Sequence, residues 1–157
     1  HQLYSAPSVG IQEVGGSPIQ LTRGCEYAIR GLTYLAMNHG EDPILLADIA
    51  KSIGAPTNYL SNIFQILTRL GLVNSHRGAK RGYTLARDPA EVNLRDIVEG
   101  MEGPISISSC NLDKGWCEHE SQCSMYSVWE DLQDTISEKL ESTSLKSLTG
   151  SCFLPPA

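Results

Sequence analysis

The spacing of apolar residues in the first half of the chain predicts three helices. Over residues 22–38 the apolar side chains fall three or four positions apart, which indicates one helical face. A short apolar stretch at 45–53 breaks at Gly54, and a further helical pattern then occupies 56–71. Two short helices joined by a tight turn that contains glycine predict a helix-turn-helix.

The pattern then changes from helical to extended. Residues 72–76 and 83–85 read as two strands, and they flank the basic, glycine-bounded loop 77–82. A hairpin of this kind directly after a helix-turn-helix is typical of the wing of a winged helix. Residues 93–101 predict one more short helix before the chain enters a loop that is rich in cysteine.

A long helix is predicted from Ser124 to about Leu145. Its apolar residues recur at steps of four, three, four and four, and they are Met125, Trp129, Leu132, Ile136 and Leu140. A single apolar stripe on a long polar helix needs a partner. Because little chain remains to provide one, we expect the stripe to form the two-fold interface of a homodimer.

The expected fold is therefore mainly α with a small β wing: a winged helix-turn-helix domain plus a long C-terminal dimerisation helix. The 157 residues suffice for one globular domain with an extension. The expected order is a leader or disordered arm (1–20), a winged-helix DNA-binding domain (21–102), a cysteine loop (103–123), the dimerisation helix (124–146) and a tail (147–157). Neither a membrane span nor a signal peptide is recognisable, so we expect a cytoplasmic protein.

The distribution of charge favours nucleic acid as a partner, although the formal net charge of -6 taken alone argues against it. Residues 51–87 hold six basic residues and no Asp or Glu, whereas residues 88–141 hold thirteen acids and three bases. One part of the molecule is expected to be a basic face and the other an acidic body.

Double-stranded DNA with a palindromic operator is the expected partner of this basic face. In a helix-turn-helix, the first residues of the second helix lie nearest the base edges of the major groove. Asn58 is the best candidate for base contact because asparagine pairs with adenine through two hydrogen bonds. The cations of the wing are placed to reach phosphates or the minor groove. The residues predicted to approach DNA are Thr57, Asn58, Tyr59, Ser61, Arg77, Lys80 and Arg81.

Three of the five cysteines, Cys110, Cys117 and Cys123, fall within one loop, whereas Cys25 and Cys152 stand alone. In a reducing compartment such a cluster more often binds metal or senses redox state than forms disulfides. Zinc would need four ligands, and His119 is available to complete the set. An iron–sulfur cluster is the alternative. The spacing alone does not separate the two and slightly favours zinc.

Several motifs together resemble the iron–sulfur winged-helix regulators of the IscR/NsrR type. The resemblance covers about residues 20–145. The matching motifs are Leu21-Thr22-Arg23-Gly24 with Tyr27-Ala28, Leu46-Ala47-Asp48-Ile49-Ala50, Tyr59-Leu60, Arg77-Gly78 with Gly82-Tyr83, and the cysteine loop ahead of the last helix.

This resemblance implies a dimeric transcriptional regulator whose DNA affinity is controlled by an iron–sulfur cluster, 2Fe-2S or 4Fe-4S, on Cys110, Cys117 and Cys123. It also implies a fourth ligand that varies among members. Where IscR-like members have a histidine, this sequence has Tyr126. NsrR-like members supply a carboxylate from the first helix of the other subunit, and the matching residue is Glu26.

Other assignments stay open at this point. His119 and Cys25 are the alternatives to Glu26 as the fourth ligand. A winged-helix module stapled by zinc, which binds DNA or protein without sensing, is the alternative function. An enzyme is not expected, because no nucleophile and base form a recognisable constellation and the histidines are scattered.

Overall fold

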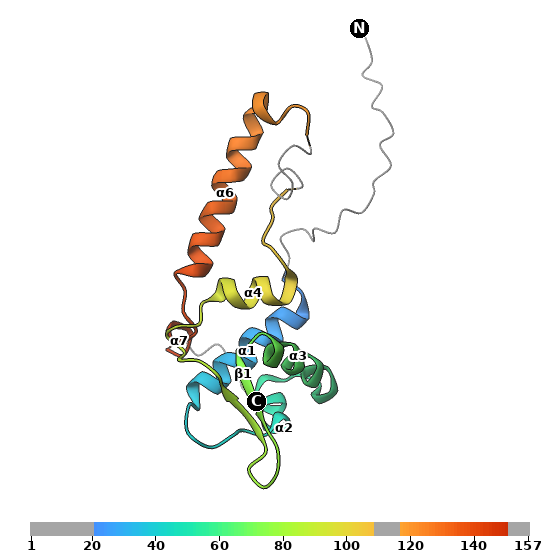
Figure 1. Cartoon of the computed structure of the whole chain (residues 1–157), viewed down its shortest axis with the longest axis vertical. Helices are drawn as coiled ribbons and strands as arrows, with labels where there is room; N and C mark the ends of the chain where they lie inside the picture. The colour runs from blue at the N-terminus through green and yellow to red at the C-terminus, as the bar shows by residue number, and fades with distance from the viewer. Residues whose placement is uncertain (1–20, 109–116, 151–157) are drawn as a thin grey trace.

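The computed structural model describes residues 21–108 and 117–150. The predicted arm at 1–20, most of the tail, and Cys110 and Cys152 lie outside the described residues. The helices and strands are α1 (Arg23–Met37), α2 (Leu46–Ile53), α3 (Thr57–Arg69), β1 (Val73–His76), β2 (Gly82–Leu85), α4 (Leu94–Glu102), the 3-10 turn η1 (Glu120–Gln122), α6 (Ser124–Glu141) and α7 (Leu145–Leu148). Figure 1 shows one body of helices with the small hairpin, from which α6 projects.

The core of this body lies between the apolar faces of α1, α2 and α3. Leu32 of α1, Ile53 of α2 and Phe64 of α3 are each fully buried. Burial of one such side chain contributes about 1.5–3 kcal/mol of transfer free energy. A Cβ on Gly31 would lie 2.9 Å from the Phe64 ring, so α1 and α3 approach each other where α1 has no side chain. The helix-turn-helix predicted from the sequence is confirmed by α2, α3 and the left-handed Gly54 between them.

The predicted wing is a two-stranded antiparallel hairpin in which Val73 pairs with Leu85 and His76 pairs with Gly82. A third segment supports it, because the backbone N–H and carbonyl of Ile44 bond to those of Tyr83 at 3.0 and 2.8 Å. Gly82 has φ of 137°, and a Cβ there would lie 2.5 Å from the Ile44 carbonyl oxygen. The base of the wing is therefore held against the loop that follows α1.

The last long helix is shorter than the sequence predicted. It ends at Glu141, and a second helix, α7, begins at Leu145 and includes residues that we expected in the tail. The Leu94 N–H donates to the Thr143 carbonyl (2.9 Å), and the Leu145 N–H donates to the Val92 carbonyl (2.7 Å). These bonds turn the chain back toward the body and bury Leu145 completely. The apolar stripe itself ends at Leu140, and the polar residues 141–144 that follow do not extend it.

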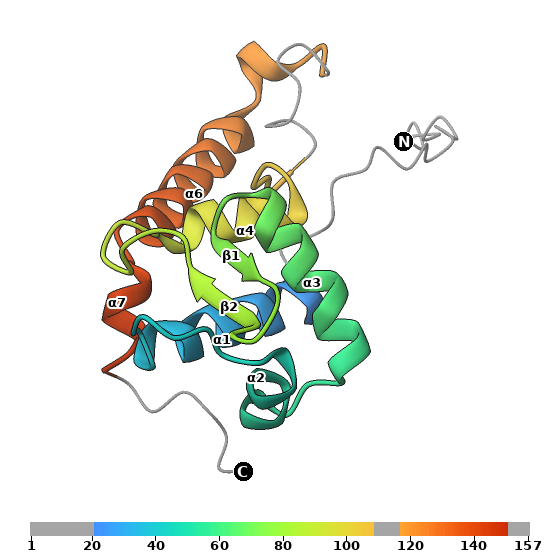
Figure 2. The same cartoon turned by 60° about the horizontal axis from the view of Figure 1, so that its bottom comes forward.

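Helix α6 has no buried residue along its whole length. Its base is attached to α4, where Arg95 forms an ion pair with Glu141 at 3.0 Å, and its other end projects away from the body in both views (Figures 1 and 2). Met125 and Leu132 of the predicted stripe are 46% and 44% exposed. Two residues of the stripe that we assigned to a dimer interface are thus exposed in the single chain, whereas Trp129, Ile136 and Leu140 are partly buried.

None of the helices in the two described ranges combines the length and the apolar character that a membrane span needs.

Candidate functional site

The first turn of α3 presents polar side chains to solvent. Its inner face buries Leu60, Ile63, Phe64 and Leu67, so the other positions of its first turn face solvent. Thr57 and Asn58 are exposed and Ser61 is partly exposed, as a surface that meets DNA requires. Helix α3 lies at the surface of the body, and the hairpin follows it directly (Figure 2).

Tyr59 differs from these neighbours because its ring is turned toward α1. It packs edge to face on Tyr27, with ring centroids 5.9 Å apart. A Cβ on Gly24 would lie 3.1 Å from the Tyr59 hydroxyl oxygen. Although 43% of Tyr59 is exposed, part of its surface is committed to the start of α1.

The wing presents three exposed cations, Arg77, Lys80 and Arg81. The Lys80 Nζ donates a hydrogen bond of 2.9 Å to an Asp42 carboxylate oxygen. This bond and the negative charge of Asp42 hold the pKa of Lys80 above its ordinary value. His76, on the strand before the loop, is bonded through Nε2 to the Thr84 hydroxyl across the hairpin at 2.8 Å.

Two of the three clustered cysteines can be placed. Cys117 is partly exposed and Cys123 is exposed, and the two line one open hollow together with Glu118, Glu120 and Tyr126. The hollow lies at the end of α6 that projects from the body, just before that helix begins (Figure 1). Within residues 21–108 and 117–150 no group of three or more His, Cys, Asp or Glu is close enough to hold a metal ion. The third clustered cysteine, Cys110, lies outside these ranges.

Cys25 and His119 are placed less favourably as ligands. Cys25 is fully buried in α1. Burial, with the charges of Glu102 and Glu26 adding to it, raises the pKa of the Cys25 thiol to about 11. A thiol that resists ionisation is a poor ligand, because metals bind the thiolate. His119 is exposed and is not among the side chains that line the hollow of Cys117 and Cys123.

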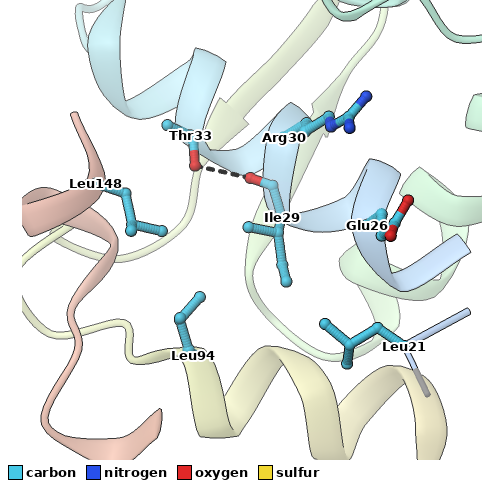
Figure 3. A pocket seen from close by; sticks show the side chains of 7 residues that line it. All are labelled: Leu21, Glu26, Ile29, Arg30, Thr33, Leu94 and Leu148. Atoms are coloured by element: carbon cyan, nitrogen blue, oxygen red, sulfur yellow. Dashed lines mark hydrogen bonds between the residues drawn. The ribbon is translucent and has the colours of Figure 1, made fainter. Parts of the chain in front are cut away.

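Glu26 is exposed in the first turn of α1 and borders an apolar hollow of about 320 Å³. Figure 3 shows the aliphatic side chains of Leu21, Ile29, Leu94 and Leu148 around this hollow. α1 belongs to the body, whereas Cys117 and Cys123 precede the projecting end of α6 (Figure 1). The structure therefore does not bring the element that carries Glu26 to Cys117 and Cys123 of the same chain.

Sequence reasoning missed three long-range contacts that involve acids, one of which is the Arg95–Glu141 pair at the base of α6. In addition, Asp42 pairs with Lys80, and Glu102 at the end of α4 accepts hydrogen bonds from both the backbone N–H and the hydroxyl of Thr22. Each contact joins residues that are far apart in the chain, and isolated acids carry no local signal for such pairs.

A helix-turn-helix followed by a basic wing defines the class of protein as a winged-helix DNA-binding regulator. The family model Rrf2, described as an iron-dependent transcriptional regulator, matches residues 21–151. The chain belongs to the Rrf2 family. Among curated relatives, the HTH-type transcriptional regulator IscR of Photorhabdus laumondii is 32% identical over 130 residues, which are 83% of this chain and 79% of that protein. IscR of Escherichia coli O1:K1 is 29% identical over 83% of this chain and 80% of that protein.

Solved structures agree with this family. CymR, the global cysteine regulator of B. subtilis, matches with a TM-score of 0.72 and 30% identity and covers 84% of this chain and 97% of that chain. T. potens IscR matches with a TM-score of 0.68 and 30% identity and covers 84% and 87% of the two chains. The predicted winged-helix fold is confirmed. The relatives are named as transcriptional regulators, so the prediction of a regulator rather than an enzyme is confirmed as well.

Proposed function

We propose that this Rrf2-family transcriptional regulator is a cytoplasmic homodimer whose affinity for operator DNA is controlled by an iron–sulfur cluster on Cys110, Cys117 and Cys123. The observation that carries the proposal is the shared hollow of Cys117 and Cys123, both accessible to solvent. Accessible thiols at the surface are available for deprotonation and metal binding, in contrast to the buried thiol of Cys25. The description of the family as iron-dependent supports iron over zinc.

The described residues fit such a group, because two thiols share one hollow and carboxylates border it. Cys110 precedes this segment by a few residues and would supply the third thiolate. The charge of a bound cluster, and whether the cluster stays intact, would change with oxidation, nitric oxide or iron supply. The protein's own part is to hold three thiolates on one loop and to leave the fourth position to a weaker ligand.

Glu26 is our proposal for that fourth ligand, supplied by the second subunit. It is exposed at the start of α1, which belongs to the body and not to the projecting helix α6. A ligand on the body of one copy can meet the cysteines at the projecting end of α6 of the other copy when α6 of each copy lies across the body of the other. A carboxylate is a harder ligand for iron than a thiolate, which suits a site that must respond to a signal.

The homodimer is supported by two apolar surfaces on the same chain that are at least partly exposed to solvent. One is the stripe of α6 that includes Met125 and Leu132, and the other is the hollow bordered by Ile29 and Leu94. Both would be covered if α6 of each copy lay on the body of the other. A closed two-fold arrangement of this kind places two recognition helices about one turn of DNA apart, as a palindromic operator requires.

For DNA binding we propose two groups of residues with different tasks. Thr57, Asn58 and Ser61 at the exposed start of α3 read base edges. Arg77, Lys80 and Arg81 of the wing bind phosphates, which gives affinity with little sequence preference. Tyr59, which the sequence grouped with the base readers, is left out of this set because its ring packs on Tyr27 of α1.

One anaerobic purification tests the sensing part of the proposal. We expect a coloured protein with absorbance in the visible and with iron and acid-labile sulfide bound to the dimer. A colourless protein that contains zinc would overturn the iron–sulfur assignment and favour the zinc-stapled alternative. Failure to retard any promoter fragment at low salt would instead favour a protein-interaction module and overturn DNA binding itself.

A further inference from the structure

The start of α1, the recognition helix α3 and the end of α4 meet at one residue, Gly24. A Cβ at this position would lie 3.1 Å from the Tyr59 hydroxyl oxygen, 3.6 Å from Thr22 Oγ1 and 3.9 Å from the Met101 methyl carbon. Gly24 is itself buried. Three helices therefore converge where one of them has no side chain, and we call this set the Gly24 junction.

On the DNA side, the junction holds the recognition helix through Tyr59. Tyr59 lies in the first turn of α3, next to the proposed base reader Asn58. Its ring stacks edge to face on Tyr27, one turn further along α1, with an angle of 75° between the rings. An aromatic pair of this geometry contributes about 0.5–1.5 kcal/mol beyond its buried area. The position of the first turn of α3 thus depends on the first two turns of α1.

On the other side, the junction is tied to the end of α4 through Glu102. The Thr22 backbone N–H donates to a Glu102 carboxylate oxygen at 3.1 Å, and the Thr22 hydroxyl donates to the same oxygen. The same hydroxyl accepts the Cys25 N–H at 3.2 Å and so caps α1. Glu102 is the last residue of α4, and the cysteine segment begins directly after it.

We propose that the Gly24 junction is the link through which the state of the cysteine segment reaches the DNA-reading helix, and that Tyr59 is a positioning residue of α3 rather than a base reader. Any displacement of the segment after Glu102 acts on Thr22 and hence on the start of α1. Tyr27 and Tyr59 carry that displacement to the first turn of α3. The signal that this link would transmit rests on the proposed function. The contact between Gly24 and Tyr59 is independent of that function.

Contact through a single hydroxyl allows a suppressor experiment. Gly24→Ala places a methyl group against the Tyr59 hydroxyl, while alanine itself favours the helix. Because Gly24 is buried, this variant cannot alter a direct contact with DNA. We expect an operator affinity about fivefold lower, with unchanged melting temperature and dimer content. Tyr59→Phe removes the hydroxyl and keeps the ring on Tyr27, so its affinity should stay within about twofold of the parent.

The double variant Gly24→Ala with Tyr59→Phe decides the question. If the methyl group acts through the hydroxyl, operator affinity should return to that of Tyr59→Phe alone. A double variant as weak as Gly24→Ala would overturn the junction, and so would a Gly24→Ala protein that binds the operator normally. A change in the preferred bases in Tyr59→Phe, read from a library of operator fragments, would overturn the positioning role and restore base reading.

Glu102→Ala tests the link to the cysteine segment. Operator affinity of the variant is measured with and without bound iron–sulfur cluster, next to the parent and to Asp96→Ala, which removes an exposed acid from the same helix, as a control. We compare the ratio of the affinity with cluster to the affinity without cluster. In Glu102→Ala this ratio should lie at least about fivefold closer to one than in the parent, with cluster content unchanged. An unaltered ratio would overturn the link. If the parent binds no cluster at all, the proposed function fails, while the Gly24 and Tyr59 suppressor result still stands or falls by itself.

Discussion

The Lys80 ammonium lies 2.9 Å from an Asp42 carboxylate oxygen, so one of the three cations of the wing is already paired with an acid of the same chain. Asp42 is kept close to the wing because Ile44, two residues further along, is bonded through its backbone to Tyr83 at the base of the wing. A DNA phosphate must therefore compete with Asp42 for Lys80.

Asp42→Asn should free Lys80 and raise the affinity for DNA of random sequence. Exposed ion pairs are weak and screened by salt, so the expected gain is about two- to fivefold and is lost at high salt. Fluorescence anisotropy with a random duplex measures it. Glu41→Gln is the matched control, because it removes the same charge from the neighbouring exposed residue. Equal gains in both variants would mean that net charge, and not the Lys80 pair, sets the effect.

Base reading and phosphate binding should separate on mutation. Asn58→Ala should lower affinity for the operator while affinity for random DNA stays nearly constant, because base contacts carry the sequence preference. Arg77→Ala should weaken both duplexes alike and lower the slope of log affinity against log salt by about one. Gel retardation over a series of salt concentrations measures both quantities. Equal loss on both duplexes in Asn58→Ala would refute its role in base readout.

The cysteines should differ sharply in their effect on bound iron. Replacing Cys110, Cys117 or Cys123 by Ala should abolish the visible absorbance, because each removes a thiolate from a set of three. Cys25→Ala should keep it, since the Cys25 thiol is buried and its pKa is raised to about 11. Cys152→Ala should keep it as well. Full colour and iron content in Cys117→Ala would show that the hollow beside it is not the cluster site.

Glu26→Ala should leave the fold and the dimer intact and give a cluster that is lost faster. Glu26 is exposed, so stability should change little. Cluster loss is followed as the decay of visible absorbance in air. An unchanged decay would move the assignment to His119, and His119→Ala is the variant to compare.

A mixed dimer shows whether the ligand comes from the partner. One subunit carries Glu26→Ala and the other carries Cys117→Ala. If the carboxylate is supplied by the second subunit, one site keeps all its ligands and half of the parent cluster content survives with normal stability. Two damaged sites would place the ligand in the same subunit as the cysteines.

The apolar stripe of α6 should be essential for the dimer. Leu132→Lys places a charge on a stripe residue that is 44% exposed in the single chain, and the dissociation constant should rise at least about a hundredfold. Asp134→Lys introduces the same side chain, and at about 100° per residue position 134 faces away from position 132. Analytical ultracentrifugation compares the two. Dissociation of both variants, or of neither, would contradict an interface on this stripe.

The structure shows where sequence reasoning succeeds and where it stops. Local signals located α1, because Thr22 caps its start by accepting the Cys25 N–H and Asn38 lies at its end. The change from helical to alternating pattern located the wing. Both depend on neighbouring residues, which a single sequence displays.

The end of α6 and the acid pairs depend on distant residues. Leu145 stands five positions after Leu140, and the backbone bonds to Val92 and Leu94 fix where the chain breaks between them. Likewise, Thr22 and Glu102 stand 80 positions apart. The sequence grouped Tyr59 with Thr57 and Asn58 by proximity, but it could not show which of these side chains turns toward α1.

The return of the chain to the core at Leu145 makes the cysteine loop and α6 an insertion within a single folding unit. Residues before and after this insertion share one core, since Leu145 is buried in the same cluster as Leu32 and Ile97. The segment leaves the body after Glu102 and re-enters it within a few residues of Glu141. A fragment that stops at residue 102 would therefore lack part of its own core and should not serve as an isolated DNA-binding domain. Grafting a different insertion between these two attachment points would keep the DNA-binding body intact and change the signal to which it responds.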